Sequence, residues 1–431
     1  MDLGHWLSGA AGRHPDRVAV AAPGESVTYR ELLLRAVRAA GALHVRGVRR
    51  GQPVALMLEP GLPFVEALHG CLLLGAPAVP VDPRLAERER QAILRDVEER
   101  VRRPLRGETG VFQLPEPPER EAVALIVHTS GTTGTPKPIE ITYGNIRANA
   151  RGLAQAMRLT DDERWLCPLP FSHVGGLMVV LRSTLMASTA VLAPPPFDEH
   201  AVAAQLRDGA ITIASLVPTQ LQRLLDAGAT PGPALRRVLL GGGPMPRALL
   251  SRARAAGFPV CPSYGLTQAC STVTVAEPGD LETAGRALPG VGVAIAAGGE
   301  IIVSGATVNT LGSLRTGDLG RMDDQGRLIV TGRKGDVIVS GGENVSPAEV
   351  EAVLAEHPDV VEVAVFARPH ALWGEAVTAL VVPRAGAEVA QGELRAHCLE
   401  RLAGYKVPKA FELVGALPRT ESGKVRRADL R

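Results

Sequence analysis

Lysine is scarce in this 431-residue chain. Of its 47 basic residues, only five are lysines and the other 42 are arginines. Lysine carries a compact, flexible ammonium, so a lysine that must reach a phosphate or a carboxylate is hard to replace by the planar guanidinium of arginine. The five lysines are therefore candidates for functional positions, with chance retention as the alternative: Lys137, Lys334, Lys406, Lys409 and Lys424.

A strong net charge and long apolar runs are missing as well. The formal net charge is +2, so bulk charge indicates neither nucleic acid nor an anionic membrane as a partner. The most apolar stretch, residues 174–193, is interrupted by Arg182, and it predicts a buried helix followed by a strand and no membrane span. Residues 1–17 show no charged-then-apolar secretion signal, so we expect a cytoplasmic protein.

Cysteine is also rare, and its spacing suggests neither disulfides nor a metal site. No two cysteines form a CxxC pair, and most of them lie in apolar stretches. We expect buried thiols in a reducing cytosol at all five positions: Cys71, Cys167, Cys261, Cys270 and Cys398.

Short apolar segments alternate with amphipathic segments over the first two thirds of the chain. This alternation predicts an α/β architecture with mostly parallel sheets. The expected strands are residues 53–58, 122–127, 165–169, 189–193, 211–216, 237–240 and 259–261. The expected helices are residues 30–45, 62–74, 145–157, 199–207, 219–225 and 247–256.

The pattern changes after Gly285. Segments 298–303, 313–319 and 326–331 alternate with glycine turns, which predicts a small β-rich subdomain. A polar, glycine-flanked junction follows, and we place a domain boundary near Lys334. Ser346 and Glu349 have the spacing of a capping box that opens a helix reaching about residue 356. Strands at 360–367, 376–382 and 411–413 and a helix at 391–402 complete a compact C-terminal unit.

Residues 128–138 form a loop rich in Ser, Thr and Gly directly after an apolar strand. Glycines let the backbone approach phosphates, successive N–H groups and hydroxyls donate to phosphate oxygens, and Lys137 adds a positive charge. The loop lacks the Gly-Lys-Ser/Thr ending of a Walker A motif. A nucleotide polyphosphate site is the functional interpretation, and a plain surface loop is the alternative.

Other segments have properties that suit the rest of a nucleotide. Residues 241–243 are three glycines that leave room for a planar base. Tyr264 can stack on adenine, and the hydroxyl of Thr267 can reach a phosphate. Asp318 follows a strand, where one carboxylate can accept hydrogen bonds from both ribose hydroxyls. Lys424 lies on a tight turn near the C-terminus.

In this order and spacing, the segments resemble the adenylate-forming superfamily, which includes acyl- and aryl-CoA synthetases, luciferases and peptide-synthetase adenylation domains. The resemblance covers nearly the whole chain, and its most specific parts are residues 129–137 and 316–344. It implies a large N-terminal domain, residues 1–333, of two α/β subdomains plus the small β-rich subdomain, which binds AMP and the acyl substrate. A small mobile α+β lid, residues 334–431, would follow and would turn about a hinge at Gly335.

The resemblance also implies two half-reactions. A carboxylate first attacks the α-phosphate of ATP, and after rotation of the lid the thiol of CoA attacks the acyl-AMP. Lys424 would stabilise the charge that develops between carboxylate and α-phosphate. Thr267 would contact the α-phosphate, and His173 would line the acyl pocket and the thiol tunnel.

The remaining site residues are carried over from the same motifs. ATP or AMP would be bound by Thr129, Ser130, Gly131, Thr132, Thr133, Gly134, Lys137, Gly241, Gly242, Gly243, Ser263, Tyr264, Gly265, Thr267, Asp318 and Arg333. CoA would be bound by Ser340, Gly341, Gly342, Trp373, Tyr405 and Lys406.

Two positions need separate interpretation. Gln268 stands where the superfamily has the glutamate that binds Mg²⁺, and a neutral amide oxygen is a weaker ligand for a hard dication. We therefore expect a weak metal position and a reduced dependence on Mg²⁺. Arg182 lies in an apolar run, where it could pair with a buried acid or bind a second carboxylate of the substrate.

Comparison within the superfamily reduces the range of possible acid substrates. Ser172 and His173 replace the aspartate pattern that binds an amino group, so amino acids are disfavoured. Residues 238–274, 340–344 and the short length look most like the 2-succinylbenzoate–CoA ligases of menaquinone synthesis. A general aryl- or fatty-acyl-CoA ligase is the alternative, and a degenerate nucleotide-binding protein is the minor one. The implied partners are a small carboxylic acid, ATP, Mg²⁺ and CoA, and the sequence is compatible with a homo-oligomer.

Overall fold

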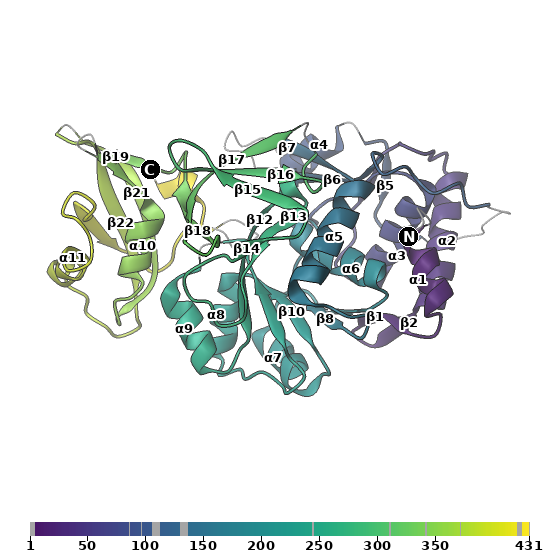
Figure 1. The fold of residues 1–431 in the computed structure, drawn as a ribbon, viewed down its shortest axis with the longest axis horizontal. Coiled ribbons are helices and arrows are strands. Elements are labelled where there is room, and N and C mark those ends of the chain that lie inside the picture. The colour runs from purple at the N-terminus through teal and green to yellow at the C-terminus, as the bar shows by residue number, and fades with distance from the viewer. Residues whose placement is uncertain are drawn as a thin grey trace.

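Four β-sheets and their helices make up the protein, as a computed structural model shows (Figure 1). The structure describes residues 5–85, 87–95, 97–105, 113–129, 137–243, 245–309, 312–340, 343–370, 372–419 and 425–430. Within these ranges the sheets have nine, five, four and five strands. None of the helices in these ranges is long and apolar enough to cross a membrane.

The nine-stranded sheet forms the centre of the N-terminal part. Its order is β14 (Arg286–Ala287), β13 (Ser271–Val275), β12 (Val260–Leu266), β11 (Arg237–Leu240), β10 (Ile213–Leu216), β8 (Arg164–Cys167), β9 (Thr189–Leu192), β1 (Val18–Ala22) and β2 (Glu25–Thr28). The six strands from β12 to β1 are parallel, as the sequence predicts, and the edge strands pair antiparallel. The described strands β9 and β10 are buried throughout, because helices cover both faces of a parallel sheet.

The five-stranded sheet lies beside it and has the order β5 (Glu99–Val101), β3 (Val54–Leu56), β4 (Ala78–Pro80), β6 (Val123–Thr129) and β7 (Lys137–Thr142). Its first four strands are parallel, and β6 and β7 form an antiparallel pair with Thr129 opposite Lys137. The N-terminal helices are α1 (Trp6–Arg13), α2 (Tyr29–Val45), α3 (Leu62–Leu74), α4 (Glu87–Leu94), α5 (Tyr143–Met157) and α6 (Val174–Met186).

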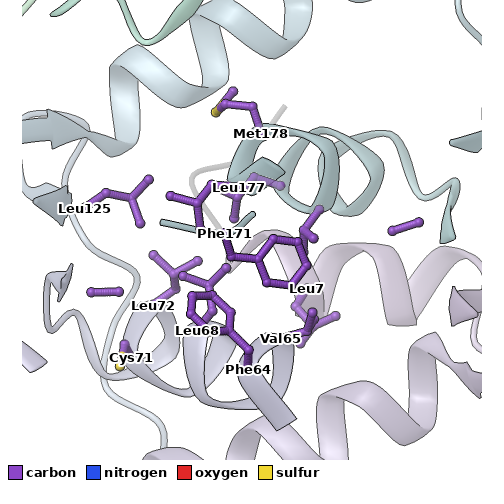
Figure 2. Close-up of a cluster of buried hydrophobic side chains, with 14 of the residues drawn as sticks. Leu7, Phe64, Val65, Leu68, Cys71, Leu72, Leu125, Phe171, Leu177 and Met178 are labelled. Atoms are coloured by element: carbon purple, nitrogen blue, oxygen red, sulfur yellow. The ribbon is translucent and has the colours of Figure 1, made fainter. Parts of the chain in front are cut away.

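One hydrophobic core joins the two sheets. Phe64 and Leu68 on α3 pack toward Phe171 and Leu177 near the start of α6, and the rings of Phe64 and Phe171 are 5.0 Å apart (Figure 2). A second core lies on the other face of the nine-stranded sheet, under α7 (Glu199–Asp208), α8 (Pro218–Asp226) and α9 (Arg247–Ala255). The helix and strand expected within residues 174–193 are confirmed as α6 and β9.

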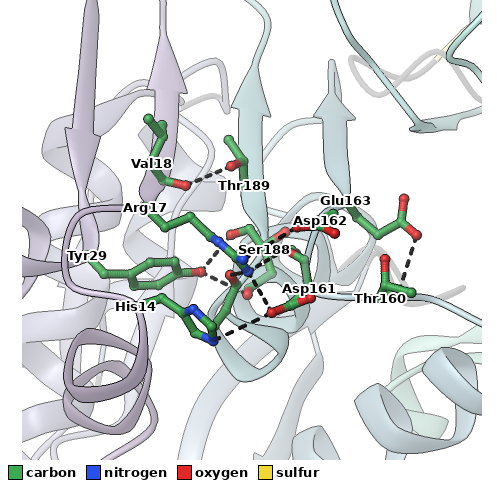
Figure 3. A network of polar contacts seen from close by, with 12 residues as sticks. His14, Arg17, Val18, Tyr29, Thr160, Asp161, Asp162, Glu163, Ser188 and Thr189 are labelled. Carbon is green, nitrogen blue, oxygen red and sulfur yellow. Dashed lines mark hydrogen bonds and ion pairs between the residues drawn. The ribbon is translucent and has the colours of Figure 1, made fainter.

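Polar contacts fasten the N-terminal segment to the nine-stranded sheet (Figure 3). Arg17 donates to the backbone oxygens of Asp161 (2.8 Å) and Ala187 (3.1 Å). The Tyr29 hydroxyl is buried and lies 2.9 Å from the backbone oxygen of Ser183 and 2.6 Å from that of Ser188. These bonds hold the start of α2 against the end of α6, so the N-terminus is part of the same folded body.

The β-rich subdomain is the antiparallel sheet of β15 (Val291–Ile295), β16 (Glu300–Gly305), β17 (Ser313–Met322) and β18 (Leu328–Arg333). The sequence predicts three of these strands and misses β15. The polypeptide leaves β18 at Arg333 and enters the C-terminal unit, which lies beside this sheet (Figure 1).

The C-terminal unit has its own sheet and core. Its elements are β19 (Ile338–Ser340), β20 (Glu343–Val345), α10 (Pro347–Leu354), β21 (Val360–His370), β22 (Gly374–Pro383), α11 (Gln391–Leu399), β23 (Ala410–Leu413) and the short 3₁₀ helix η2 (Arg427–Leu430). The structure thus has the large α/β domain, β-rich subdomain and small α+β unit expected from the sequence. The domain boundary near Lys334 stays a prediction.

The capping box predicted at the start of α10 is wrong. Ser346 occupies the N-cap position without a side-chain capping bond, because its hydroxyl lies 2.5 Å from the backbone oxygen of Thr331 on β18. Glu349 instead forms an ion pair with Lys406, with 2.6 Å between Oε1 and Nζ. Partners far away in sequence therefore replace the local reciprocal bonds.

All five cysteines are free and buried, as expected.

Candidate functional site

Three of the predicted residues meet where β12, β17 and β18 come together. The Tyr264 hydroxyl donates to Oδ2 of Asp318 at 2.7 Å. Arg333 is opposite Asp318 in the pairing of β17 with β18, and its Nη1 is 3.6 Å from Oδ1. The Asp318 side chain is 15% exposed, so its carboxylate is held by protein groups and still reaches the surface.

The surroundings of Tyr264 keep its hydroxyl neutral, and hydrogen bonds fix the backbone before Asp318. Burial and the neighbouring Asp318 raise the pKa of Tyr264, so its hydroxyl remains a donor at neutral pH. The Thr316 hydroxyl donates to the backbone oxygen of Ile301 and accepts from the N–H of Asp318. Buried Glu300 accepts from the N–H of Gly317 at 3.2 Å and pairs with Arg315. Glu300 was missed by sequence reasoning, because it lies 15 residues before its partner on another strand.

Glycine is required beside this group at the end of β11. A Cβ on Gly241 would lie 2.7 Å from the hydroxyl oxygen of Ser263, and that hydroxyl donates to the backbone oxygen of Leu240 at 2.8 Å. Gly242 has φ of +81°, which disfavours other residues. Residues 241–243 thus present backbone without side chains next to Ser263, and their role beside a planar base stays a prediction.

Thr267 and Gln268 lie on a one-turn 3₁₀ helix, η1 (Thr267–Ala269), that connects β12 to β13. This turn contacts β7, whose first residue is Lys137. Thr129, the last residue of β6, is paired with Lys137, the first residue of β7. A Cβ on Gly265 would come within 2.0 Å of the Ser271 backbone oxygen, so the two strands approach too closely there for a side chain.

Several predicted residues lie outside the described part of the chain. They are Ser130, Gly131, Thr132, Thr133, Gly134, Gly341, Gly342 and Lys424. Arg419 and Val425, which lie on either side of Lys424 in the chain, form an isolated antiparallel bridge. The roles of these residues stay predictions.

His173 lies immediately before α6 and is exposed. Its neighbour Ser172 donates to Oδ2 of Asp82 at 2.9 Å, just after β4. Asp82 also accepts from the guanidinium of Arg84, at 2.9 Å from Nε and 2.7 Å from Nη2. Burial would raise the pKa of Asp82, but these bonds outweigh it and lower the pKa to about 2. Sequence reasoning missed Asp82 and Arg84, although an acidic residue directly after a buried strand is a recognisable signal.

The expectation that Arg182 pairs with a buried acid is wrong. Arg182 is 1% exposed, and no described acidic side chain forms an ion pair with it. Its Nη2 donates to Oδ1 of Asn149 (2.6 Å) and to the hydroxyl oxygen of Thr272 (3.2 Å), and its guanidinium lies 5.7 Å from the centre of the Trp165 ring. Burial lowers the pKa of Arg182 to about 10, so it remains a cation at neutral pH.

The residues predicted to bind CoA gather on one part of the C-terminal unit. Trp373 and Tyr405 are 38% and 41% exposed. The Lys409 ammonium lies 5.0 Å from the centre of the Trp373 ring, and the Lys406 ammonium lies 5.8 Å from that of Tyr405. The result is an exposed aromatic and basic surface, which suits a nucleotide with several phosphates. Ser340 is buried at the end of β19, beneath the adjoining residues.

The residues near Thr267 fit a protein-held metal ion poorly. Within the described ranges, no three His, Cys, Asp or Glu side chains gather as a metal site would require. The turn itself supplies the neutral amide of Gln268. A magnesium ion there would depend on oxygen ligands other than a carboxylate of this turn.

Comparison with known families agrees with this geometry. The AMP-binding enzyme family matches residues 7–102 and 99–314, and the AMP-binding enzyme C-terminal domain matches residues 349–424. These matches cover most of the chain, which therefore belongs to the AMP-binding enzyme family.

Individual relatives extend over the full length. A 2-succinylbenzoate–CoA ligase of Bacillus licheniformis is 36% identical over an alignment 480 positions long, which spans 100% of both chains. The o-succinylbenzoate CoA synthetase of Bacillus subtilis, solved with the acyl-adenylate intermediate OSB-AMP, is 34% identical with a TM-score of 0.92 and coverage of 99% and 98%. A double mutant of that synthetase, solved with the product analogue OSB-NCoA, is 33% identical with the same coverage and a TM-score of 0.74.

Proposed function

We propose that this chain is an ATP-dependent 2-succinylbenzoate–CoA ligase of menaquinone biosynthesis that acts through an acyl-adenylate. The observation that carries the proposal is the 36% identity to a ligase of this specificity over the full length of both chains. The convergence of Tyr264, Asp318 and Arg333 on one surface supports the nucleotide part independently.

In the first half-reaction, the ribose hydroxyls donate to the Asp318 carboxylate, which Tyr264 and Arg333 orient. Adenine lies along the glycine ledge at residues 241–243, and Thr267 donates to the α-phosphate. The succinyl carboxylate attacks the α-phosphorus while the bond to pyrophosphate breaks. Lys424 stabilises the negative charge in this step, and a fixed positive charge at such a place acts mainly electrostatically.

Pyrophosphate is held at the mouth of the β6–β7 hairpin. Lys137 is exposed there, and Thr129 faces it across the hairpin. ATP enters with Mg²⁺, as in a solved Bacillus subtilis relative that holds ATP and a magnesium ion. Because Gln268 carries no charge, this turn would contribute at most a neutral amide oxygen to the ligands of that ion.

In the second half-reaction, residues 334–431 turn about Gly335 relative to residues 1–333. Trp373 and Tyr405, which are exposed, and Lys406, whose ammonium pairs with Glu349, then hold the nucleotide end of CoA, and Gly341 and Gly342 lie along the pantetheine. The thiol attacks the acyl carbonyl, AMP leaves, and His173 borders the thiol path. A reaction that consumes ATP and free CoA belongs in the cytoplasm.

The test is thioester formation measured by mass spectrometry, with ATP, Mg²⁺, CoA and one acid at a time. We expect 2-succinylbenzoyl-CoA to form faster than the thioesters of benzoate or a medium-chain fatty acid. Faster turnover of another acid would support the ligase mechanism and would show that 2-succinylbenzoate is not the preferred substrate. No thioester and no acid-dependent ATP–pyrophosphate exchange with any acid would contradict the enzyme assignment and favour a nucleotide-binding protein.

A further inference from the structure

The turn that carries Thr267 and Gln268 is joined to β13 by a strained stretch of backbone. Cys270 has φ of 55° and Ser271 has φ of 94°, both in the left-handed region that favours glycine. Two adjacent non-glycine residues in that region are unfavourable, and they persist only where surrounding contacts hold them. The strain lies within four residues of Thr267, which is expected to contact the α-phosphate, and of Gln268, which is expected to be a weak metal position.

The next residue, Thr272, is held from two sides. Its backbone oxygen accepts from Nδ2 of Asn149 on α5 at 2.8 Å, and its hydroxyl oxygen accepts from Nη2 of Arg182 on α6 at 3.2 Å. Asn149 and Arg182 also bond to each other at 2.6 Å. All three side chains are at most 5% exposed, so water does not compete for these bonds.

A buried guanidinium without an acidic partner is costly to keep. Removing an ionised group from water without a counter-charge is unfavourable unless hydrogen bonds compensate. Arg182 gains two neutral acceptors, and its Nε has no hydrogen-bond partner among the described residues. This arrangement is poor for stability alone. It does place a planar donor group against the one residue that ends the strained stretch.

The same helix holds the strained stretch through a second contact. Met178 lies one turn before Arg182 on α6, and its sulfur is 4.0 Å from the sulfur of Cys270. On the opposite side, Gly265 of β12 lies against the Ser271 backbone. The conformation of Cys270 and Ser271 is thus fixed between β12 and α6.

We propose that Arg182 is a positioning residue for adenylation: through Thr272 it holds the Cys270–Ser271 backbone and so orients the turn that carries Thr267 and Gln268. This inference rests on the proposed function, in which that turn faces the α-phosphate. It assigns Arg182 to the nucleotide side of the site and not to binding the second carboxylate of the substrate.

Thr272→Val and Thr272→Ser are the matched test pair. Valine keeps the volume of threonine but cannot accept from Arg182, whereas serine keeps the hydroxyl. We expect kcat of ATP–pyrophosphate exchange to fall about tenfold in Thr272→Val and to stay within about twofold of the natural protein in Thr272→Ser, since small misplacements of positioned groups have effects of this size. Equal rates for the two variants would overturn the proposal.

Arg182→Met separates positioning from substrate binding. Exchange is measured with 2-succinylbenzoate and with 4-oxo-4-phenylbutanoate, which lacks the ring carboxylate. If Arg182 is a positioning residue, kcat falls by the same factor with both acids, and AMP binds more weakly in calorimetry. A loss confined to 2-succinylbenzoate, with AMP binding unchanged, would show that Arg182 binds the carboxylate and would overturn the proposal.

Two further outcomes are covered by the same design. If Arg182→Met fails to fold, the Thr272 pair decides the question. If the natural protein shows no exchange with any acid, the proposed function fails, and AMP affinity in Thr272→Val against Thr272→Ser still tests the orientation of the turn. Equal AMP affinities in that case would overturn the inference.

Discussion

The carboxylate of Asp82 should stabilise the folded protein more at neutral pH than at acid pH, and the substitution Asp82→Asn should remove this dependence. Its pKa falls from the usual 3.8 to about 2, because bonds from Arg84 and Ser172 outweigh the effect of burial. A shift of this size corresponds to about 2 kcal/mol of interaction with the ionised form. The group lies between β4 and the start of α6, so the interaction joins the two sheets next to His173.

The sign follows from the direction of the shift. A carboxylate with a depressed folded-state pKa stabilises the protein above its unfolded-state pKa, and this contribution is lost as the pH falls toward the folded-state value. We expect Asp82→Asn to lower the free energy of unfolding by about 2 kcal/mol at pH 7 and by roughly half of that at pH 3. The difference should vanish near pH 2.

Urea unfolding of the natural protein and of Asp82→Asn at pH 7 and pH 3 measures this difference, and other carboxylates cancel between the two proteins. Ser172→Ala is the control, because it removes one donor while Arg84 stays in place, and we expect it to cost about 1 kcal/mol at pH 7. An Asp82→Asn effect of equal size at pH 7 and pH 3 would refute the electrostatic reasoning, as would an Asp82→Asn variant as stable as the natural protein.

Three further predictions concern the nucleotide. Tyr264→Phe removes a donor to a charged acceptor, so the Kd for AMP should rise by up to about tenfold in calorimetry, and an unchanged Kd would count against the role of Asp318. Gln268→Glu should increase the dependence of adenylation on Mg²⁺, and identical Mg²⁺ titrations for both forms would contradict this. Lys424→Ala should lose acid-dependent ATP–pyrophosphate exchange and keep AMP binding, and retained exchange would remove Lys424 from the first step.

The fold was largely predictable because its signals are local. Leu62–Leu74 is the clearest case, since a mostly apolar segment of that length, interrupted by Glu66 and His69 and followed by Gly75, predicts both the buried helix and its end. Strand–helix alternation likewise predicted the parallel sheets. The strands at the edges, such as β15, carry weak alternation and were missed.

The contacts that support the site were much less predictable. Ser172 and Asp82 are 90 residues apart, and Asn149 and Thr272 are 123 apart, so no local pattern connects them. Motifs indicated Tyr264 and Asp318 because their order along the chain is distinctive. The hydrogen bonds that orient such residues depend on which elements become neighbours after folding, and that information is not in the spacing.

Two wrong predictions have the same physical origin. Ser346 and Glu349 have capping-box spacing, yet both side chains are used by partners on β18 and in the segment before β23. Arg182 was expected to need an acid, yet an amide and a hydroxyl accept from it. Local rules state which bonds a side chain can make, and tertiary neighbours decide which of them form.

This chain resembles two solved structures of the Bacillus subtilis synthetase to different degrees. The chain superimposes better on the Bacillus subtilis synthetase with its acyl-adenylate than on the double mutant with a product analogue. Because those two structures share nearly the same sequence, the difference in score reflects how their parts are arranged. The described arrangement of this chain is therefore more similar to that of the acyl-adenylate complex. In it, the Ser346 hydroxyl bonds to the Thr331 backbone across Gly335, so the turn about Gly335 proposed above must break this polar bond. The bond from the Lys334 N–H to Gly317 lies before Gly335 and is kept. An exposed bond of this kind exchanges readily with water, which lowers the cost of the proposed turn.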